Sequence, residues 1–449
     1  MVYLNLLFVL TSKVGKVGRS IFFTSKQRVD SKHIMSVFVF MFCIFIILSC
    51  AKKPSSDFDK GLEFYRQNKL EEACSLFESA AEQDKNDPDV YTWLAETYRR
   101  LRQTDTAFAT AKKAIEIDSC HCFAHTVLAY IFNPMYSSWE KANKDSTWSH
   151  LLRAIACDST DGNVWLAIWT ESIYRGDKNL EKKALSSLIK TGFLTPAVLS
   201  YNRWMLRYVP QKAILLTNGD MDTYPAVAVQ EVESYRPDVA VVNYSLLNTP
   251  WYARFVRDKY DIQLPVADSQ LDSLRAYQDE NGNVITVANQ IMKGWLKMRQ
   301  SGTLDNPIAI AVTVGDLSFA EDTQDHLKLA GAFHLWLPEP SKSPLDTSMI
   351  RTSLAGINPD DFTGPFVSAK DYSSVRISSS NRIVANITDL ALSYCKALLE
   401  SKRASEAFKM LTWAEQFEHK TELGPIFTED IEQLKKIAQQ QMKEQDRSN

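Results

Sequence analysis

The spacing of apolar residues changes twice along the chain. Over residues 57–190, apolar and small residues recur every three to four positions, as on helices that bury one face. Beyond residue 211, near-continuous apolar runs at 213–216, 238–247 and 307–314 alternate with segments of helical spacing. Apolar strands separated by helices favour a parallel sheet that is covered by helices on both faces.

A third pattern begins near residue 381, where small residues alternate with aromatic ones at helical spacing. It predicts a helical hairpin over 381–435, followed by a polar tail over 436–449. Before it, residues 326–340 are expected to lead from a helix into an edge strand that prolines terminate. The expected fold class is therefore α plus α/β: helical repeats over 57–190, an α/β domain with a parallel sheet over 191–380, and the C-terminal hairpin.

The N-terminal region has the pattern of an export signal. Residues 36–48 are thirteen uncharged, mostly apolar residues, a length typical of a signal-peptide core and short for a membrane span. Residues 47–50, Ile-Leu-Ser-Cys, resemble the lipobox of bacterial lipoproteins, in which the cysteine is lipidated after cleavage. We therefore predict a leader over 1–50, lipidation at Cys50 and a tether over 51–56. The alternative is a single membrane anchor or an uncleaved signal.

This lipobox pattern also predicts a location. Ala51, rather than an aspartate, follows Cys50, which resembles the outer-membrane sorting pattern of Gram-negative lipoproteins. The expected location is the cell envelope, lipid-anchored on the periplasmic side of the outer membrane.

The helical region contains a repeat of 34 residues. Shifting the sequence by 34 positions aligns Gly61 with Ala95, Phe64 with Tyr98, Ala73 with Ala107 and Ala80 with Ala114. The pattern resembles the tetratricopeptide repeat, in which small residues let two antiparallel helices pack closely. We expect three to four helical pairs, interrupted by an insertion at 133–146. The resemblance implies a concave face that binds a peptide or protein, and it supplies no catalytic groups by itself.

Polar residues gather directly behind the first apolar run. Asn218, Asp220, Asp222 and Thr223 come after residues 213–216, the place where open α/β sheets bind ligands. Three interpretations stay open. The segment could be a structural turn in which Asp222 or Thr223 caps a helix. It could bind a ligand or cation, or Asp220 and Asp222 could act as acid and base.

The second apolar run ends in a similar way, with Asn243, and then Asn248 and Trp251 come next. If the first two strands are neighbours, these amides and the indole face Asp220 across one sheet edge, and they suit a sugar or a polar metabolite. The alternative is that Asn248 caps the next helix and Trp251 packs in the core.

Three segments of the α/β region carry a second resemblance. Residues 213–252, 307–314 and 327–340 contain the patterns TNGDxDTxP, RPDVxVVNxSLLNTxWY and LxLxGxxxLxLP. These segments are similar to the soluble C-terminal part of bacterial membrane proteins related to protein O-mannosyltransferases. The membrane portion of that family, where sugar transfer is expected, is replaced here by the export signal and the repeats. The resemblance therefore implies an accessory envelope role, through contact with a glycan, a glycoprotein or a partner protein, and no catalytic residues.

Cys120, His121, Cys122 and His125 form a Cys/His cluster. These residue types can bind zinc or copper, although residues at the join of two repeat helices point in different directions. The alternative is a disulfide from Cys120 or Cys122 to another position, as an oxidising compartment allows.

The composition is that of an ordinary folded protein, with 449 residues, 45% hydrophobic, 23% charged and a net charge of -3. Because no basic field is present, we predict no nucleic-acid partner. No Walker A, GxSxG, HExxH or GxGxxG pattern occurs, and we predict no cofactor and no metal site.

The sequence therefore predicts a binding or scaffold protein more than an enzyme. The repeats are expected to hold a protein partner in their groove, and the α/β domain to recognise a polar ligand or a glycan-related partner. Two alternatives stay open: an enzyme that processes a glycan or phosphoester through Asp220 and Asp222, and a purely structural scaffold.

Overall fold

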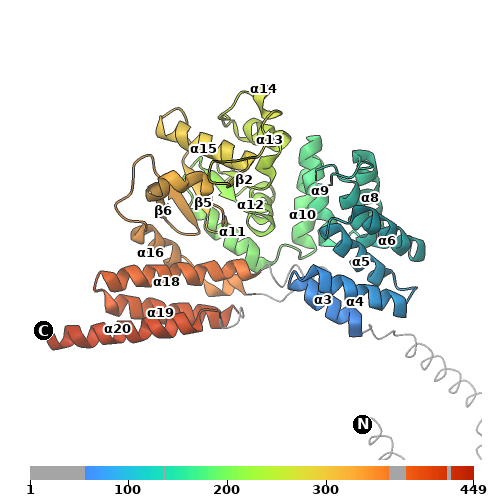
Figure 1. Cartoon of the computed structure of the whole chain (residues 1–449). Helices are drawn as coiled ribbons and strands as arrows, with labels where there is room; N and C mark the ends of the chain where they lie inside the picture. The colour runs from blue at the N-terminus through green and yellow to red at the C-terminus, as the bar shows by residue number, and fades with distance from the viewer. Residues whose placement is uncertain (1–55, 136, 364–380, 422–425, 449) are drawn as a thin grey trace, which may run out of the picture. The chain divides into compact units, whose positions relative to one another are not determined.

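The computed structural model describes residues 56–135, 137–363, 381–421 and 426–448. The chain divides into residues 1–59 and a compact unit of residues 60–449, which holds the repeats and the sheet (Figure 1). The predicted leader and the lipidation site at Cys50 lie outside the described residues, as does the predicted tether apart from Ser56, which begins the first described helix. Within the described residues, no helix combines the length and the apolar character that a bilayer crossing requires.

The N-terminal part consists of antiparallel helical pairs. The described helices are α3 (Ser56–Arg66), α4 (Leu70–Gln83), α5 (Pro88–Arg100), α6 (Thr104–Ile117), α7 (Cys122–Phe132), α8 (Lys144–Cys157), α9 (Gly162–Arg175) and α10 (Lys178–Lys190). The small residues of the 34-residue spacing are the points of closest packing: Ala73 and Ala107 have no exposed surface. A Cβ atom on Gly61 would lie 2.6 Å from Phe77, so only glycine allows this approach.

The insertion between α7 and α8 packs onto the repeats through one aromatic side chain. The ring of Trp139 lies 5.0 Å from that of Phe108 and 5.5 Å from that of Phe132, and its indole N–H donates to Asp105. Trp139 thereby fixes the insertion against α6 and α7.

A five-stranded sheet forms the centre of the next part. Its strands are β1 (Ile214–Thr217), β2 (Ala240–Asn243), β5 (Ile308–Ala311), β6 (Leu327–Leu329) and β7 (Phe333–Trp336), in the order β2-β1-β5-β7-β6. The first three strands are parallel and coincide with the predicted apolar runs, whereas β7 pairs antiparallel with both β5 and β6. The sheet is therefore mixed, and the fold is α plus α/β.

The segment 326–340 differs from the prediction. It contains no α-helix, because β6 and β7 form a hairpin there, preceded by the 3-10 turn η2 (Ser318–His326). β6, rather than the strand before the prolines, is the edge of the sheet. Three- and four-residue strands are too short to show an alternating pattern.

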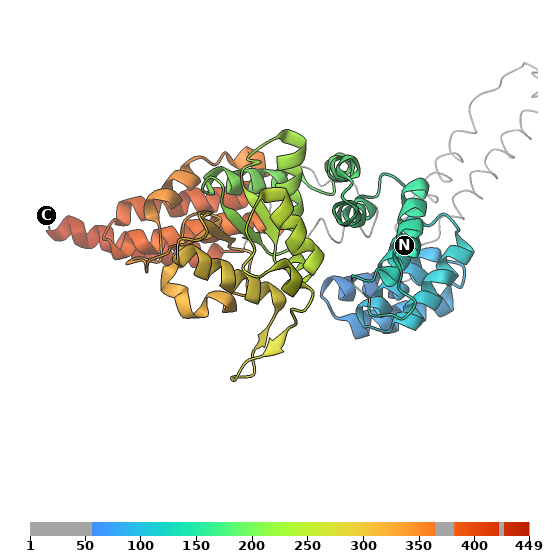
Figure 2. The same ribbon diagram turned by 90° about the horizontal axis from the view of Figure 1, so that it is seen from above.

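The sheet is flanked by α11 (Pro196–Tyr208), α12 (Asp220–Glu233), α13 (Pro250–Tyr260), α15 (Val287–Gln300) and α16 (Thr347–Ala355). Shorter elements are η1 (Leu246–Asn248), α14 (Asp268–Leu271) and η3 (Pro359–Phe362). A separate two-stranded ribbon, β3 (Tyr277–Gln278) and β4 (Val284–Ile285), extends away from the sheet (Figure 2).

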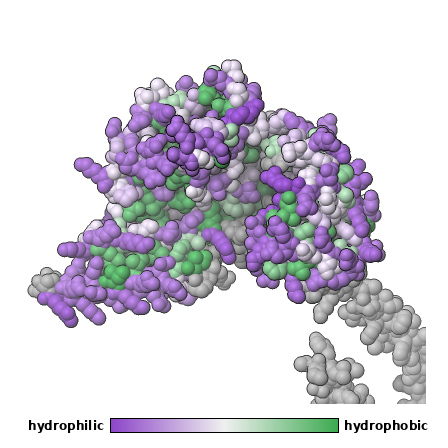
Figure 3. Space-filling view, in the orientation of Figure 1, coloured by the Kyte–Doolittle hydropathy of each residue, from purple (hydrophilic) through white to green (hydrophobic). Residues whose placement is uncertain are grey.

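The C-terminal part contains η4 (Asn381–Val384), α18 (Ala385–Glu400), α19 (Ala404–Lys420) and α20 (Thr428–Ser448), and the three α-helices lie side by side (Figures 1 and 2). The prediction of a polar tail over 436–449 is corrected by the structure, in which residues 436–448 continue the helix α20. Ile431, Leu434 and Ala438 form a narrow apolar stripe against α19, and Lys435 pairs with Glu415. Apolar residues also gather on the face of these helices seen in Figure 3.

Candidate functional site

The first turn of α12 decides the role of the predicted loop. Gly219 precedes the helix, and the carboxylate of Asp222 reaches back to accept hydrogen bonds from the backbone N–H groups of Asn218 at 2.7 Å and Gly219 at 2.9 Å. Thr313, which comes after β5, donates its hydroxyl to the same carboxylate. Asp222 is therefore the group that starts α12 and ties it to the end of β5.

Burial governs the protonation of this carboxyl group. Asp222 is 2% exposed, and its burial raises its pKa, although the hydrogen bonds from Thr313, Asn218 and Gly219 act in the opposite direction. Since both carboxylate oxygens already accept hydrogen bonds from the chain, Asp222 serves the turn that the sequence offered as one interpretation.

Pro225 lies inside α12, where a proline cannot donate to the carbonyl four residues earlier. The side-chain amide of Asn202, on α11, instead donates to that carbonyl oxygen of Met221 at 3.0 Å. The helix therefore continues through the proline.

Thr223 and Asn243 join the ends of the first two strands. The hydroxyls of Thr217 and Thr223 lie 2.7 Å apart, and the amide of Asn243 donates to the Thr223 hydroxyl at 3.0 Å. The amide oxygen of Asn243 also accepts the backbone N–H of Leu246. Both predicted site residues are buried and bonded within the fold.

The other predicted residues do not converge on one point. Asn218 is exposed, while Asn248 accepts the backbone N–H of Ala288 at 3.0 Å and so connects η1 to α15. Trp251 is half-buried and packs edge to face on Tyr174 of α9, with ring centroids 5.4 Å apart. The edge therefore does not bring Asn243, Asn248 and Trp251 to a shared ligand.

A second polar network at this edge was not anticipated from the sequence. The hydroxyl of Tyr244 lies 2.9 Å from Asp316 and bonds the amide oxygen of Asn289, and Asn289 donates to Ser318 at 2.6 Å. Burial raises the pKa of Tyr244, as does its hydrogen bond to Asp316. These groups satisfy one another and hold the loop after β5 against the start of α15.

An open cavity lies elsewhere, between the repeats and α12. Its volume is about 710 Å³, within the size range of ligand sites. Asp220 and Tyr224 of α12 line it, as do Leu166 and Thr170 of α9 and Tyr130 of α7. Of the predicted site residues, Asp220 alone lines this cavity. The remaining lining is basic, polar or apolar.

The basic lining comes from the end of α5 and the turn after it, Arg99, Arg100 and Arg102. Burial lowers the pKa of Arg99, but its ion pair with Glu96 at 2.7 Å outweighs this and raises the pKa overall. Its guanidinium also lies 5.2 Å from the centroid of the Tyr130 ring. Sequence reasoning missed this cluster, although three arginines within four positions mark it in the motif RRLR.

Direct contacts fix the α12 wall of the cavity against the repeats. Trp169 of α9 meets Tyr224 edge to face, with ring centroids 4.8 Å apart, and both side chains are buried. Lys259 of α13 pairs with Glu181 of α10 at 3.2 Å and with Glu231 of α12 at 2.6 Å. The cavity is thus a joint product of the repeats and the α/β region.

The Cys/His cluster forms no metal site. Cys120 is joined to Cys157 by a disulfide, and the Cys122 thiol donates to Asp161. His121 caps α7, whereas His125 bonds His150. The four side chains therefore have separate partners, and in the described part of the chain no group of three or more His, Cys, Asp or Glu residues is placed to hold a metal ion.

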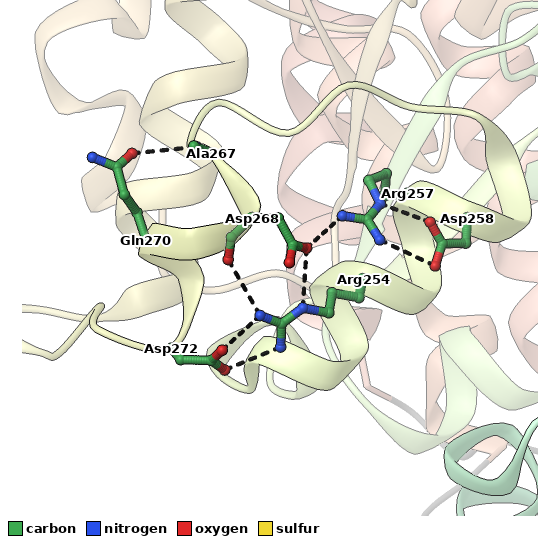
Figure 4. A network of polar contacts seen from close by, with 7 residues as sticks. All are labelled: Arg254, Arg257, Asp258, Ala267, Asp268, Gln270 and Asp272. Carbon is green, nitrogen blue, oxygen red and sulfur yellow. Dashed lines mark hydrogen bonds and ion pairs between the residues drawn. The ribbon is translucent and has the colours of Figure 1, made fainter.

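A network of arginines and aspartates around α13 and α14 is structural (Figure 4). Arg254 of α13 binds Asp268 and Asp272, and Arg257 binds Asp258 and Asp268. The arginines lower the pKa of these three carboxyl groups. Since each charge has an opposite partner, the network fastens the segment around α14 to α13.

Two family models match parts of the chain. Residues 76–109 match the tetratricopeptide repeat, and residues 199–344 match TMEM260-associated domain 2. The first match confirms the repeats. The second covers most of the α/β region and is broadly consistent with the second resemblance predicted there. A comparison with curated proteins finds no match.

Several solved structures of tetratricopeptide-repeat (TPR) proteins are similar to this chain. A thermophilic TPR protein of Thermus thermophilus is 16% identical, covers 49% of this chain and 96% of its own, and has a TM-score of 0.31. PilW, a type IV pilus biogenesis factor, is 15% identical over 48% of this chain and 87% of its own, with a TM-score of 0.30. YrrB, a TPR protein with an unusual peptide-binding site, is 12% identical over 49% and 92%, with a TM-score of 0.26.

Similarities of this size carry no argument about function. The family match at 76–109 and the paired helices define a protein that contains tetratricopeptide repeats. Such repeats are scaffolds for binding, and here they are followed by an α/β region that matches a TMEM260-associated domain.

Proposed function

We propose that this chain is an exported, lipid-anchored envelope protein that holds a segment of a partner protein in the cavity between its repeats and α12. The cavity carries this proposal, because its hydroxyl, guanidinium and apolar groups together suit a peptide. The apolar lining includes Leu70, Ile131, Met135 and Leu166.

Export is supported by two features of the chain. The sequence around Cys50 has the lipobox pattern, and the Cys120–Cys157 disulfide is of a kind that persists in oxidising compartments such as the periplasm. A glycan-related ligand of the α/β region stays a prediction.

Binding is favoured over catalysis by the positions of the two aspartates. Residues two apart on a helix face different directions, so Asp220 lines the cavity whereas Asp222 is bonded to Asn218, Gly219 and Thr313. They do not form an acid–base pair around one reacting atom.

Site-specific photocrosslinking in the native cell tests the partner. A crosslinking amino acid at Ala167, which lines the cavity, is expected to join one protein through one contiguous segment, identified by mass spectrometry. The matched control is Ala109, an exposed alanine of α6 that does not line the cavity. Identical products from both positions would contradict binding in the cavity.

Metabolic labelling with a palmitate analogue tests the anchor. The wild-type chain is expected to carry the label and to sediment with membranes, and Cys50→Ala is expected to lose the label. A label that persists in Cys50→Ala would show that Cys50 is not the lipidated residue.

A further inference from the structure

The cavity has a local excess of positive charge in a chain whose net charge is -3. Three guanidinium groups line it, and Asp220 is the one carboxylate among the described lining residues. The charge of Arg99 is paired with that of Glu96, so the excess positive charge comes from Arg100 and Arg102. Arg100 donates to the amide oxygen of Asn68 at 2.5 Å and lies over the ring of Tyr65, 4.8 Å from its centroid.

Neither Arg100 nor Arg102 has a carboxylate partner among the described residues. Arg100 is therefore held in position by neutral groups, so its charge is oriented and uncompensated. Arg102 is exposed and lies just after α5 at the rim of the cavity. Arginine pairs favourably with carboxylates because its planar N–H groups form two parallel hydrogen bonds.

Arg102 has a left-handed backbone conformation, which allows its charge to be removed by substitution with asparagine. Its φ is +64°, and Asn68, at the equivalent turn one 34-residue repeat earlier, has φ +61°. Asparagine adopts this left-handed conformation more readily than arginine does. The turn therefore accepts an asparagine without its backbone changing, and what the arginine adds is a positive charge at the cavity.

The left-handed backbone conformation alone does not identify a residue that supplies positive charge to the cavity. Lys402, between α18 and α19, has φ +57° and is also a cation, but it does not line the cavity. The position of Arg102 beside Arg100 distinguishes the two residues, and it makes Lys402 a matched control.

We propose that the cavity selects an acidic segment of the partner, whose Asp or Glu side chains pair with Arg100 and Arg102. This inference rests on the proposed function, because it names the chemistry of the segment that the cavity holds. Asp220 of α12 also lines the cavity, and its negative charge disfavours a uniformly acidic ligand, so a neutral or basic residue is expected beside α12. The apolar side chains of Ile131, Met135 and Leu166 favour a peptide over an anionic glycan, which has no aliphatic side chains to cover them.

An array of short acetylated and amidated peptides tests the proposal on the full chain. Each acidic peptide has a twin in which Gln replaces Glu and Asn replaces Asp. Acidic peptides are expected to bind about tenfold more tightly than their twins, since hydrogen bonds between charged groups are lost in the twin. Arg102→Asn is expected to remove about the same factor, and Lys402→Asn is expected to leave affinity unchanged.

Three outcomes overturn the inference. Acid and amide twins could bind equally, Arg102→Asn could match Lys402→Asn, or polygalacturonate could bind at the cavity while peptides do not. Equal binding of twins, together with a crosslink from Ala167, would leave the proposed function standing with a neutral ligand. Absence of both peptide binding and the crosslink would contradict the proposed function itself.

Discussion

Asp220 and Asp222 are separated by one residue at the start of α12, yet Asp220 lines the cavity whereas Asp222 is 2% exposed and bonded within the fold. The helix produces this difference, because successive residues rotate about 100° around its axis. The pair that the sequence offers as a single acid–base site is thus one cavity-lining residue and one structural residue.

Asp222→Asn tests the structural assignment. An asparagine amide cannot accept from the backbone N–H groups of Asn218 and Gly219 with both of its polar atoms, so a loss of about 1–3 kcal/mol in the free energy of unfolding is expected. Asp220→Asn, at the exposed first position of the helix, is expected to lose less than about 1 kcal/mol, because an exposed carboxylate at a helix N-terminus contributes little. Denaturant unfolding measures both, and equal losses would contradict the division of roles.

The second prediction concerns acid stability and the contact between His125 and His150. Their Nδ1 atoms lie 3.0 Å apart, and Nε2 of His125 lies 3.1 Å from the carbonyl oxygen of Ser119. If Nε2 donates to that oxygen, Nδ1 of His125 accepts from Nδ1 of His150, which requires the His125 ring to be neutral. Burial lowers the pKa of both histidines, and that of His150 falls to about 4.

Because the folded pKa of His150 lies below its unfolded value of about 6.5, its contribution to stability is complete above that pH and is lost as the pH falls toward 4. The unfolding midpoint is expected to fall across this range, and less steeply in His150→Phe. The comparison between the two proteins is needed because burial raises the pKa of Asp161 and Glu181, which acts in the opposite direction. An unfolding midpoint that falls equally steeply with pH in the wild-type protein and in His150→Phe would contradict the prediction.

The third prediction concerns the Cys120–Cys157 disulfide, which closes a loop with a sequence separation of 37 residues. Removing it in Cys120→Ser/Cys157→Ser is expected to lower the free energy of unfolding by about 2–4 kcal/mol, since the unfolded chain gains freedom. A reducing agent should lower the unfolding midpoint of the wild-type protein and leave that of the double variant unchanged. A wild-type midpoint that does not respond to the reductant would contradict a stabilising bond.

Part of this fold can be predicted from the sequence, because some elements have long periodic patterns. The repeats satisfy one spacing over many residues, and the buried strands β1, β2 and β5 are continuous apolar runs. The sequence did not predict the full helix α20, because its apolar stripe is narrow among Lys and Gln residues. It did not predict β6 as a separate strand, because β6 has only three residues.

The cavity could not be predicted from the sequence for a different reason. Arg99 and Arg102 lie near the end of a repeat helix, where basic residues commonly stabilise the helix dipole, so their pattern has an ordinary explanation. Their proximity to Asp220 depends on how the repeats pack against α12, which no local spacing records. The sequence therefore indicates Asp220 as a candidate but associates it with Asp222 instead of with the arginines.

The last prediction concerns Lys259, the cation that α13 inserts between Glu181 of α10 and Glu231 of α12. Lys259→Met removes the cation that pairs with these two carboxylates. The side chain of Glu181 is 10% exposed, whereas that of Glu231 is 36% exposed. Because the site is partly solvated, the expected loss in the free energy of unfolding is about 2–3 kcal/mol, at or below the value for a fully buried pair. Burial already raises the pKa of Glu181 against the effect of Lys259, so removing the lysine raises it further.

The variant should therefore be less destabilised at about pH 5 than at about pH 7, as Glu181 takes up a proton in the folded state. Adding Glu181→Gln and Glu231→Gln to Lys259→Met should recover part of the loss, because the repulsion between the carboxylates is then removed. Denaturant unfolding of the single and triple variants at both pH values measures this. A triple variant no more stable than the single one would show that Lys259 acts through the packing of its aliphatic stem rather than through its charge.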